Sequence, residues 1–475
     1  MKRKYNTHKL LTRLRRSALT LATLSFLVTA VAAQSGLRLS EYKKARLPNG
    51  MNVILMKKAG VPLVSISISV RNGSLADPAG MEGLASVTSD LLRKGTATRS
   101  AQKIASELDF IGATLDFSTG PEFVRGEAEF MKKDLAGGLS LLSDILTNPT
   151  FPVAEVEKLI KQRIDSVKDA KDQAQRVIPN YFMSGMFGNT GYGRPPDGDE
   201  NSLRKITRAD ILGFYRKAFG SDTVTIAVVG DIEPEECLKL LEKNFGAWGQ
   251  KAVPAKLPPP AASIKGRKVI LVDNPDSTQT YFAIGNLGIS RTDPDRVVLD
   301  VVNTVFGGRF TSMLNEALRV NSGLTYGASS RFFQRLTPGP FIISSYTQNK
   351  TTVEAIDMAL DVLNKLHKDG LTQEQLSSAK AYIKGQFPQR VETSNQLADL
   401  LIEYNFFGLD DSELSGYFQR IDAVSLQDVR RVIDRCYPSN DLLFVLIGKA
   451  EGIKDKIGKY GSGVVVKSIS QPGFY

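Results

Sequence analysis

The chain has 475 residues, a formal net charge of +11, 61 basic and 50 acidic residues, two cysteines and two histidines. Its length exceeds what one hydrophobic core usually supports, so two or more domains are expected. Two histidines are too few for a zinc site built on imidazole, since one of them lies near the N-terminus in a segment with the features of an export signal. Cys237 and Cys436 form no zinc or redox motif.

Residues 1–33 have the order of a secretory signal peptide. Seven basic residues precede a short apolar run, which ends in small residues at 30–33. We predict cleavage after Ala32 or Ala33 and a periplasmic or secreted location, with a retained anchor as the alternative. The rest of the chain has no apolar run of that length, so no membrane span is expected in the mature protein.

Removal of this segment changes the electrostatic balance. Without its seven basic residues, 54 basic residues face 50 acidic ones, and the net charge falls from +11 to +4. A nucleic-acid surface needs clustered Lys and Arg, and the mature sequence has no such run. Nucleic acid is therefore not expected as a partner.

The first secondary-structure elements follow from residue periodicity. Residues 64–70 alternate apolar residues with serine, which predicts a strand with one buried face. Residues 84–93 and 100–111 are predicted to be helices, each followed by a glycine that stops it. A longer helical stretch is predicted over 151–174.

The sequence repeats itself. The segment 206–230 recurs as 424–448, and each copy opens on a Ser/Thr-x-x-Asp box that caps a helix, then continues through a turn into an apolar strand. The helical stretch 151–174 has a counterpart at 371–387, which begins with Thr372 and Gln375 as a capping box. We infer two homologous domains.

A proline-rich segment, 251–267, is interpreted as the linker between domains 34–250 and 268–475. Strands and helices do not alternate regularly in either half, which favours an α+β fold with an antiparallel sheet backed by helices. The cysteines fall one in each half. Two buried, unpaired thiols are expected, with a disulfide as the alternative.

The segment from Arg71 through Gly-Met-Glu-Gly-Leu-Ala to Leu-Leu-Arg-Lys-Gly-Thr resembles the zinc-site segment of pitrilysin/insulinase-type metallopeptidases. In that family a His-x-x-Glu-His motif binds zinc and activates water. The motif positions here hold Ser86, Ser89 and Asp90, and 158–171 has no glutamate for the family's third ligand. We therefore expect no metal in this chain. The simplest interpretation of these three residues is a solvated helix face, and a different metal is the alternative.

A later segment, 306–327, also resembles the family. Arg319 and Tyr326 match an Arg/Tyr pair that, in family members, faces the zinc across a clamshell and contacts substrate. We expect Arg319 at a helix end, Gly323 in a turn and Tyr326 at a strand start. Apart from the resemblance, a surface arginine and a half-buried tyrosine are the simpler interpretation.

Residues 112–119 match the family's strand beside the zinc, where a peptide substrate adds as a further strand. The resemblance makes Ala113, Thr114, Leu115 and Asp116 candidate peptide-binding residues. An ordinary strand paired on both sides is the alternative.

Some members of the family divide their work between a zinc-bearing chain and a homologous chain that has lost the zinc motif. The sequence resembles the second kind. It predicts half of a clamshell that joins a zinc-bearing homologous partner in a heterodimer and contributes Arg319 and Tyr326 to proteolysis. A catalytically inert scaffold or peptide-binding subunit is the main alternative, and a peptidase with an unfamiliar metal is the third.

Overall fold

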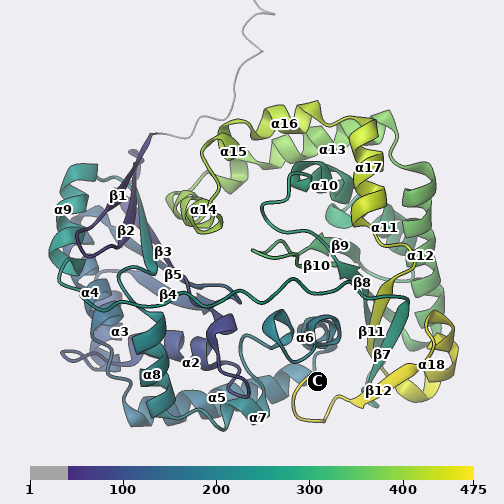
Figure 1. Ribbon diagram of the computed structural model, residues 1–475, viewed down its shortest axis with the longest axis horizontal. Helices are drawn as coiled ribbons and strands as arrows, with labels where there is room; N and C mark the ends of the chain where they lie inside the picture. The colour runs from purple at the N-terminus through teal and green to yellow at the C-terminus, as the bar shows by residue number, and fades with distance from the viewer. Residues whose placement is uncertain (1–40) are drawn as a thin grey trace, which may run out of the picture.

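The computed structural model describes residues 41–475, so the predicted signal segment 1–33 lies outside the described residues. The described chain forms two halves, each built on a sheet of six strands (Figure 1). The first sheet contains β1 Tyr42–Arg46, β2 Asn52–Lys57, β3 Leu63–Val70, β4 Thr114–Thr119, β5 Val124–Met131 and β6 Val224–Gly230. The second contains β7 Arg267–Asp273, β8 Gln279–Leu287, β9 Ala328–Phe332, β10 Pro340–Gln348, β11 Leu442–Gly448 and β12 Val464–Ser468.

Helices back each sheet. The first half has α2 Leu84–Leu91, α3 Ala101–Phe110, α4 Leu135–Thr147, α5 Val153–Lys171, α6 Ala174–Phe187, α7 Glu200–Leu203, α8 Arg208–Ala218 and α9 Pro234–Phe245. The second has α10 Arg296–Asn303, α11 Met313–Asn315, α12 Thr352–Asp369, α13 Gln373–Gln386, α14 Ser394–Phe407, α15 Ser412–Ser415, α16 Tyr417–Ala423, α17 Leu426–Cys436 and α18 Ala450–Ile457.

Five strands of each sheet follow the same order, which supports the predicted internal homology, whereas the outermost strands β1 and β12 differ in direction. The strand orders of the two sheets are β1-β2-β6-β3-β5-β4 and β12-β7-β11-β8-β10-β9. Most neighbouring strands are antiparallel, although β2 with β6, β7 with β11 and β7 with β12 are parallel. The prediction of two α+β domains that form half of a clamshell is confirmed, with mixed sheets in place of purely antiparallel ones.

Each half lends one helix to the other. Helix α6 belongs to the first half in sequence but packs on β8 and β11, and α14 of the second half packs on β3 and β6 (Figure 1). Leu397, Ala398 and Leu401 of α14 are buried against Ile54 and Val229 of the first sheet. Both faces of each central strand are therefore covered.

This exchange corrects the expectation that strand 64–70 has one buried face. Its serines are buried as well, because α14 lies over them. The Ser67 hydroxyl donates a hydrogen bond of 2.7 Å to Asp399 on α14. The serine face of β3 is therefore buried under α14, which adds the polar contact of Asp399 to a mainly apolar interface.

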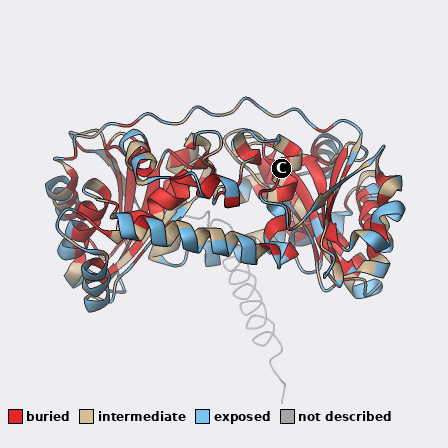
Figure 2. Cartoon of the chain, turned by 90° about the horizontal axis from the view of Figure 1, so that it is seen from below, coloured by how far each residue is buried: buried red, intermediate tan, exposed pale blue. Residues whose placement is uncertain are grey.

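Between the halves, an extended segment without helix or strand crosses from one to the other (Figure 2). It covers most of the predicted linker and ends where β7 begins, at Arg267. One described helical stretch, Arg296–Asn321, passes by length and composition as a helix that could cross a membrane. Its Leu299, Phe306 and Leu318 are buried in the core of the second half, as in the core helix of a globular domain.

The predicted helix starts are confirmed where a capping box sets them. Thr207 with Asp210, Thr372 with Gln375 and Ser425 with Asp428 all form reciprocal capping boxes at the starts of α8, α13 and α17. Cys237 and Cys436 are both buried and free, so the expectation of unpaired thiols holds.

Candidate functional site

The helix that carries the altered zinc motif, α2, is fixed at its N-terminus by Asp77. The two carboxylate oxygens of Asp77 accept hydrogen bonds from the backbone N–H groups of Gly83 (2.9 Å) and Ala85 (2.8 Å). Gly83 has φ +94°, and a β-carbon there would lie 2.8 Å from the carbonyl oxygen of Asp197. Glycine therefore lets the loop 195–199 approach the start of the helix closely.

The motif positions do not form a solvated face. Ser86 and Ser89 are buried, because this face of α2 packs against α5, β4 and the loop 195–199. The Ser86 hydroxyl donates to Asp197 Oδ1 at 2.8 Å. Ser89 donates to the Ser86 carbonyl at 2.9 Å and lies 2.8 Å from the Thr119 hydroxyl of β4. The expectation of a face that touches nothing was wrong.

Asp90 is held by an arginine that no sequence motif marks as functional. Arg163 of α5 forms an ion pair with Asp90, donates to the Ser86 hydroxyl at 3.3 Å and lies 3.5 Å from Asp197 Oδ1. Helix α5 is the element in which the resemblance places the third zinc ligand. An arginine within a predicted helix gives no local signal of such a contact.

These residues do not fit a zinc ion. A catalytic zinc needs three protein ligands with free lone pairs. Here the hydroxyl of Ser86 stands at one ligand position and Ser89 stands where the family has its general base. The carboxylate of Asp90, at the other ligand position, is already paired with the Arg163 guanidinium, which has no lone pair to offer. Within residues 41–475, no group of three or more His, Cys, Asp or Glu side chains is arranged to hold a metal.

The predicted peptide-binding strand, β4, forms the outer edge of the first sheet and pairs only with β5. Thr114 and Asp116 are exposed, whereas Leu115 is buried. The edge is partly occupied, because Arg93 donates to the Leu115 carbonyl at 2.5 Å and pairs with Asp116 at 3.0 Å. Ala113 precedes the strand, and its backbone N–H donates to the Leu108 carbonyl at 2.9 Å.

Arg319 and Tyr326 lie on the second half, between α11 and β9. Arg319 is inside the π-helical turn Glu316–Asn321, not at its end, and its guanidinium stacks 4.6 Å from the centre of the Phe310 ring. Gly323 has φ +65°, as expected for the turn. Tyr326 comes two residues before β9 and is 78% exposed, so it is not the half-buried strand residue of the simpler interpretation.

Tyr326 is exposed and Arg319 is half-buried, and the two side chains have chemistry that can act on a peptide. Among the ion pairs of residues 41–475, none involves Arg319. A guanidinium and a phenol can donate hydrogen bonds to a carbonyl oxygen or to an oxyanion. Phe310 is 63% exposed and adds an apolar surface under the guanidinium.

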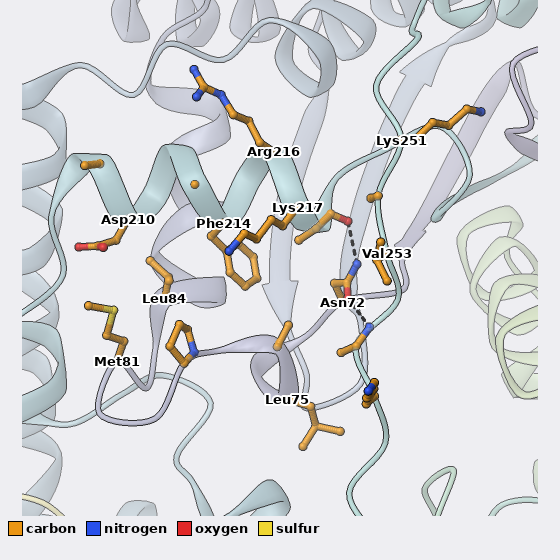
Figure 3. A pocket seen from close by; sticks show the side chains of 18 residues that line it. Asn72, Leu75, Met81, Leu84, Asp210, Phe214, Arg216, Lys217, Lys251 and Val253 are labelled. Atoms are coloured by element: carbon orange, nitrogen blue, oxygen red, sulfur yellow. Dashed lines mark hydrogen bonds between the residues drawn. The ribbon is translucent and has the colours of Figure 1, made fainter.

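An open pocket of about 840 Å³, separate from these residues, lies between α8, the turn before α2 and the start of the linker (Figure 3). Leu75, Met81, Leu84 and Phe214 give it an apolar floor, with Lys217 beside them. Asn72 donates to the Ala218 carbonyl at 2.9 Å and accepts from the Ala255 N–H at 2.7 Å, so it fixes the linker to α8. None of the sequence-predicted site residues lines this pocket.

The fold and the site define a two-domain peptidase-like chain whose metal position is filled by side chains. Residues 52–199 match the family model of insulinase (peptidase family M16), and residues 205–383 match that of the peptidase M16 inactive domain. Together the matches cover more than half of the chain. The chain belongs to the insulinase, or M16, peptidase family.

Its relatives include proteins named as uncharacterized zinc proteases and one named as a non-peptidase homolog. An uncharacterized zinc protease of Mycobacterium leprae is 25% identical over 391 residues, which cover 81% of this chain and 87% of that protein. The non-peptidase homolog YmxG of Helicobacter pylori is 24% identical over 426 residues, covering 89% and 96%. A solved peptidase M16 inactive domain of Pseudomonas fluorescens has a similar fold, with a TM-score of 0.81 at 23% identity over 86% of this chain and 98% of that one.

Proposed function

We propose that this chain is the non-catalytic subunit of a two-chain peptidase of the insulinase family. It binds peptide substrate and completes the active site of a zinc-bearing homologous partner with Arg319 and Tyr326. The observation that carries the proposal is the contrast between the halves. Arg163 fills the motif face of the first, whereas the second presents a half-buried arginine, Arg319, and an exposed tyrosine, Tyr326.

The roles of the two residues follow from where charge develops. The partner's zinc would supply an activated water, and attack of that water on a peptide carbonyl would place negative charge on the carbonyl oxygen. A phenol and a guanidinium placed beside that oxygen stabilise it more than they stabilise the neutral carbonyl, so they lower the barrier. The zinc and its water belong to the partner in this proposal.

The test is proteolysis by the mixed subunits. We expect little cleavage by this chain alone and activity on addition of the partner. Arg319→Ala and Tyr326→Phe each lower kcat/KM of the mixture by about 100-fold, the usual effect of removing one oxyanion donor. Arg331→Ala is the matched control, since Arg331 is exposed on β9 and stacks on Phe333 at 5.7 Å. Full activity of the double variant Arg319→Ala/Tyr326→Phe contradicts the proposal.

A specific observation favours the alternative of an inert scaffold. Arg93 already occupies the Leu115 carbonyl, which removes one of the edge groups that an added peptide strand requires. If the chain is only a scaffold, Arg319→Ala and Tyr326→Phe leave the rate of the mixture unchanged, and Arg93→Ala does not tighten peptide binding. Under our proposal, Arg93→Ala gives a lower Kd for an extended peptide.

The place of action in this proposal is the periplasm, reached through the signal segment 1–33. The partner is expected in the same compartment. Co-purification from the native host, followed by zinc analysis of each separated chain, identifies which subunit holds the metal.

A further inference from the structure

The guanidinium of Arg163 is enclosed by polar groups from two other elements. Asp90 and Ser86 come from α2, and Asp197 comes from the loop 195–199. Ser86 also donates to Asp197 at 2.8 Å, so its hydroxyl joins the guanidinium to the carboxylate of the loop. The exposed fractions of the Arg163 and Asp90 side chains are 27% and 24%, whereas that of Asp197 is 65%, so the Arg163–Asp90 pair is the sheltered part of the cluster.

This arrangement reverses the usual order of charges in a metal site. In a metal site, surrounding side chains supply lone pairs and the ion supplies positive charge. Here α5 supplies the positive charge through Arg163, and α2 and the loop 195–199 supply the acceptors. Arginine remains charged at all working pH values, and its fork of N–H groups can reach several acceptors at once.

We propose that the Arg163 guanidinium takes the structural place of the metal ion: it is a built-in cation that joins α2, α5 and the loop 195–199. The inference uses only contacts within the first half. It is independent of whether Arg319 and Tyr326 assist a partner. It predicts that the packing of α2, α5 and the loop 195–199 needs no metal for its stability.

The sharpest test exchanges the internal cation for an external one. Arg163→Glu places a third carboxylate beside Asp90 and Asp197, which then repel one another unless a cation is added. We expect Tm to fall by about 5 °C in EDTA and to recover by at least half in 5 mM CaCl₂, because oxygen ligands suit Ca²⁺. Wild type shows the same Tm in EDTA and in CaCl₂.

Two controls separate this effect from general charge changes. Lys161→Glu alters the charge by the same amount at an exposed position of α5 and is expected to show no recovery with calcium. NaCl at matched ionic strength measures screening alone. The inference is overturned if Arg163→Glu recovers no more in CaCl₂ than in NaCl, or if EDTA lowers the Tm of wild type.

A second measurement decides the matter if Arg163→Glu does not fold. In the double-mutant cycle of Arg163→Met, Asp90→Asn and the double variant, the double variant should have nearly the same Tm as Arg163→Met alone. The reason is that removal of the guanidinium already leaves Asp90 unpaired. Strictly additive losses in Tm overturn the inference.

Discussion

The Lys171 ammonium and the Glu200 carboxylate form an ion pair of 2.6 Å in which each side chain is only 7% exposed. Both also hold the C-terminal tail: Lys171 donates to the Gln471 carbonyl at 2.7 Å, and Glu200 accepts from the Gly473 N–H at 3.0 Å. The last residues of the second half are thereby anchored on the first.

Breaking this pair should be costly, because the remaining charge stays buried. We expect Lys171→Met to lower the free energy of unfolding by about 3 kcal/mol. Lys43→Met is the matched control, since Lys43 pairs with Glu235 at the same 2.6 Å but with side chains 40% and 71% exposed. That variant should lose less than about 1 kcal/mol. If urea titrations show equal losses in the free energy of unfolding for the two variants, burial does not strengthen the effect of breaking the Lys171–Glu200 pair.

The stability should depend on pH through three carboxylates. Burial alone raises the pKa of Glu200, but hydrogen bonds from Lys171 and the Gly473 N–H outweigh it and hold the pKa below its usual value. Burial is likewise outweighed at Asp144 by Thr96 and Arg99, and at Asp295 by Arg431 and Arg435, so the pKa of each is lowered.

A lowered pKa in the folded state means that each carboxylate stabilises the fold above its unfolded pKa of about 4. The contribution is lost as the pH falls through the folded pKa. Through these three groups we therefore expect no change in Tm from pH 7 to 5 and a steep fall from pH 4 to 2. Burial raises the pKa of Asp77 to about 8 and that of Asp300 to about 6, so these two carboxyls add stability as the pH falls from 7 to 5. Glu200→Gln should lower Tm at pH 7 and flatten the acid limb, and an unchanged slope would rule out a role for Glu200.

The exchange of α6 and α14 predicts that the linker is not needed to hold the halves together. A protease site inserted between the exposed Pro259 and Pro260 and cut after purification should give two pieces that co-elute in size-exclusion chromatography. Ala398→Glu puts a charge on the buried face of α14. After the same cut, the pieces of the Ala398→Glu variant are expected to separate or aggregate. Separation of the pieces of the unmutated chain would show that the exchanged helices bind weakly.

The two thiols should be unreactive in the folded protein. Burial raises the pKa of Cys237 to about 12 and that of Cys436 to about 11, so neither forms the thiolate that reacts with disulfide reagents at pH 8. We expect no thiol titration with Ellman's reagent in buffer and two per chain in guanidinium chloride. Fewer than two in the unfolded chain would reveal a disulfide.

The signal segment makes a prediction about the mature N-terminus. Cleavage after Ala32 or Ala33 gives a protein that begins at Ala33 or Gln34. N-terminal sequencing of protein from the periplasmic fraction checks this directly. Recovery of chains that begin at Met1 from the membrane fraction would instead identify a retained anchor.

The elements that the sequence predicted well are those set by short-range contacts. The capping boxes at Thr207 and Ser425 join residues three positions apart, and the strands that follow are continuous apolar runs. Local hydrogen bonds and periodicity determine such elements, so the two copies could be recognised and their boundaries placed.

The features that the sequence did not reveal depend on residues far apart in the chain. Ser67 meets Asp399 across 332 positions, and Arg163 meets Asp90 across 73. Neither the alternation in β3 nor the arginine in α5 indicates which distant element will cover it. The sequence therefore indicated which residues stand at the motif positions, namely Ser86, Ser89 and Asp90. It did not indicate which distant residues contact them.

Arg93 has a consequence for how the molecules behave toward one another. Strand β4 is an open sheet edge, and open edges of separate molecules tend to pair and aggregate. By placing a charged side chain across the Leu115 carbonyl, Arg93 interrupts the row of groups that such pairing would use. Removal of that charge should make the concentrated protein less soluble even where its fold is intact.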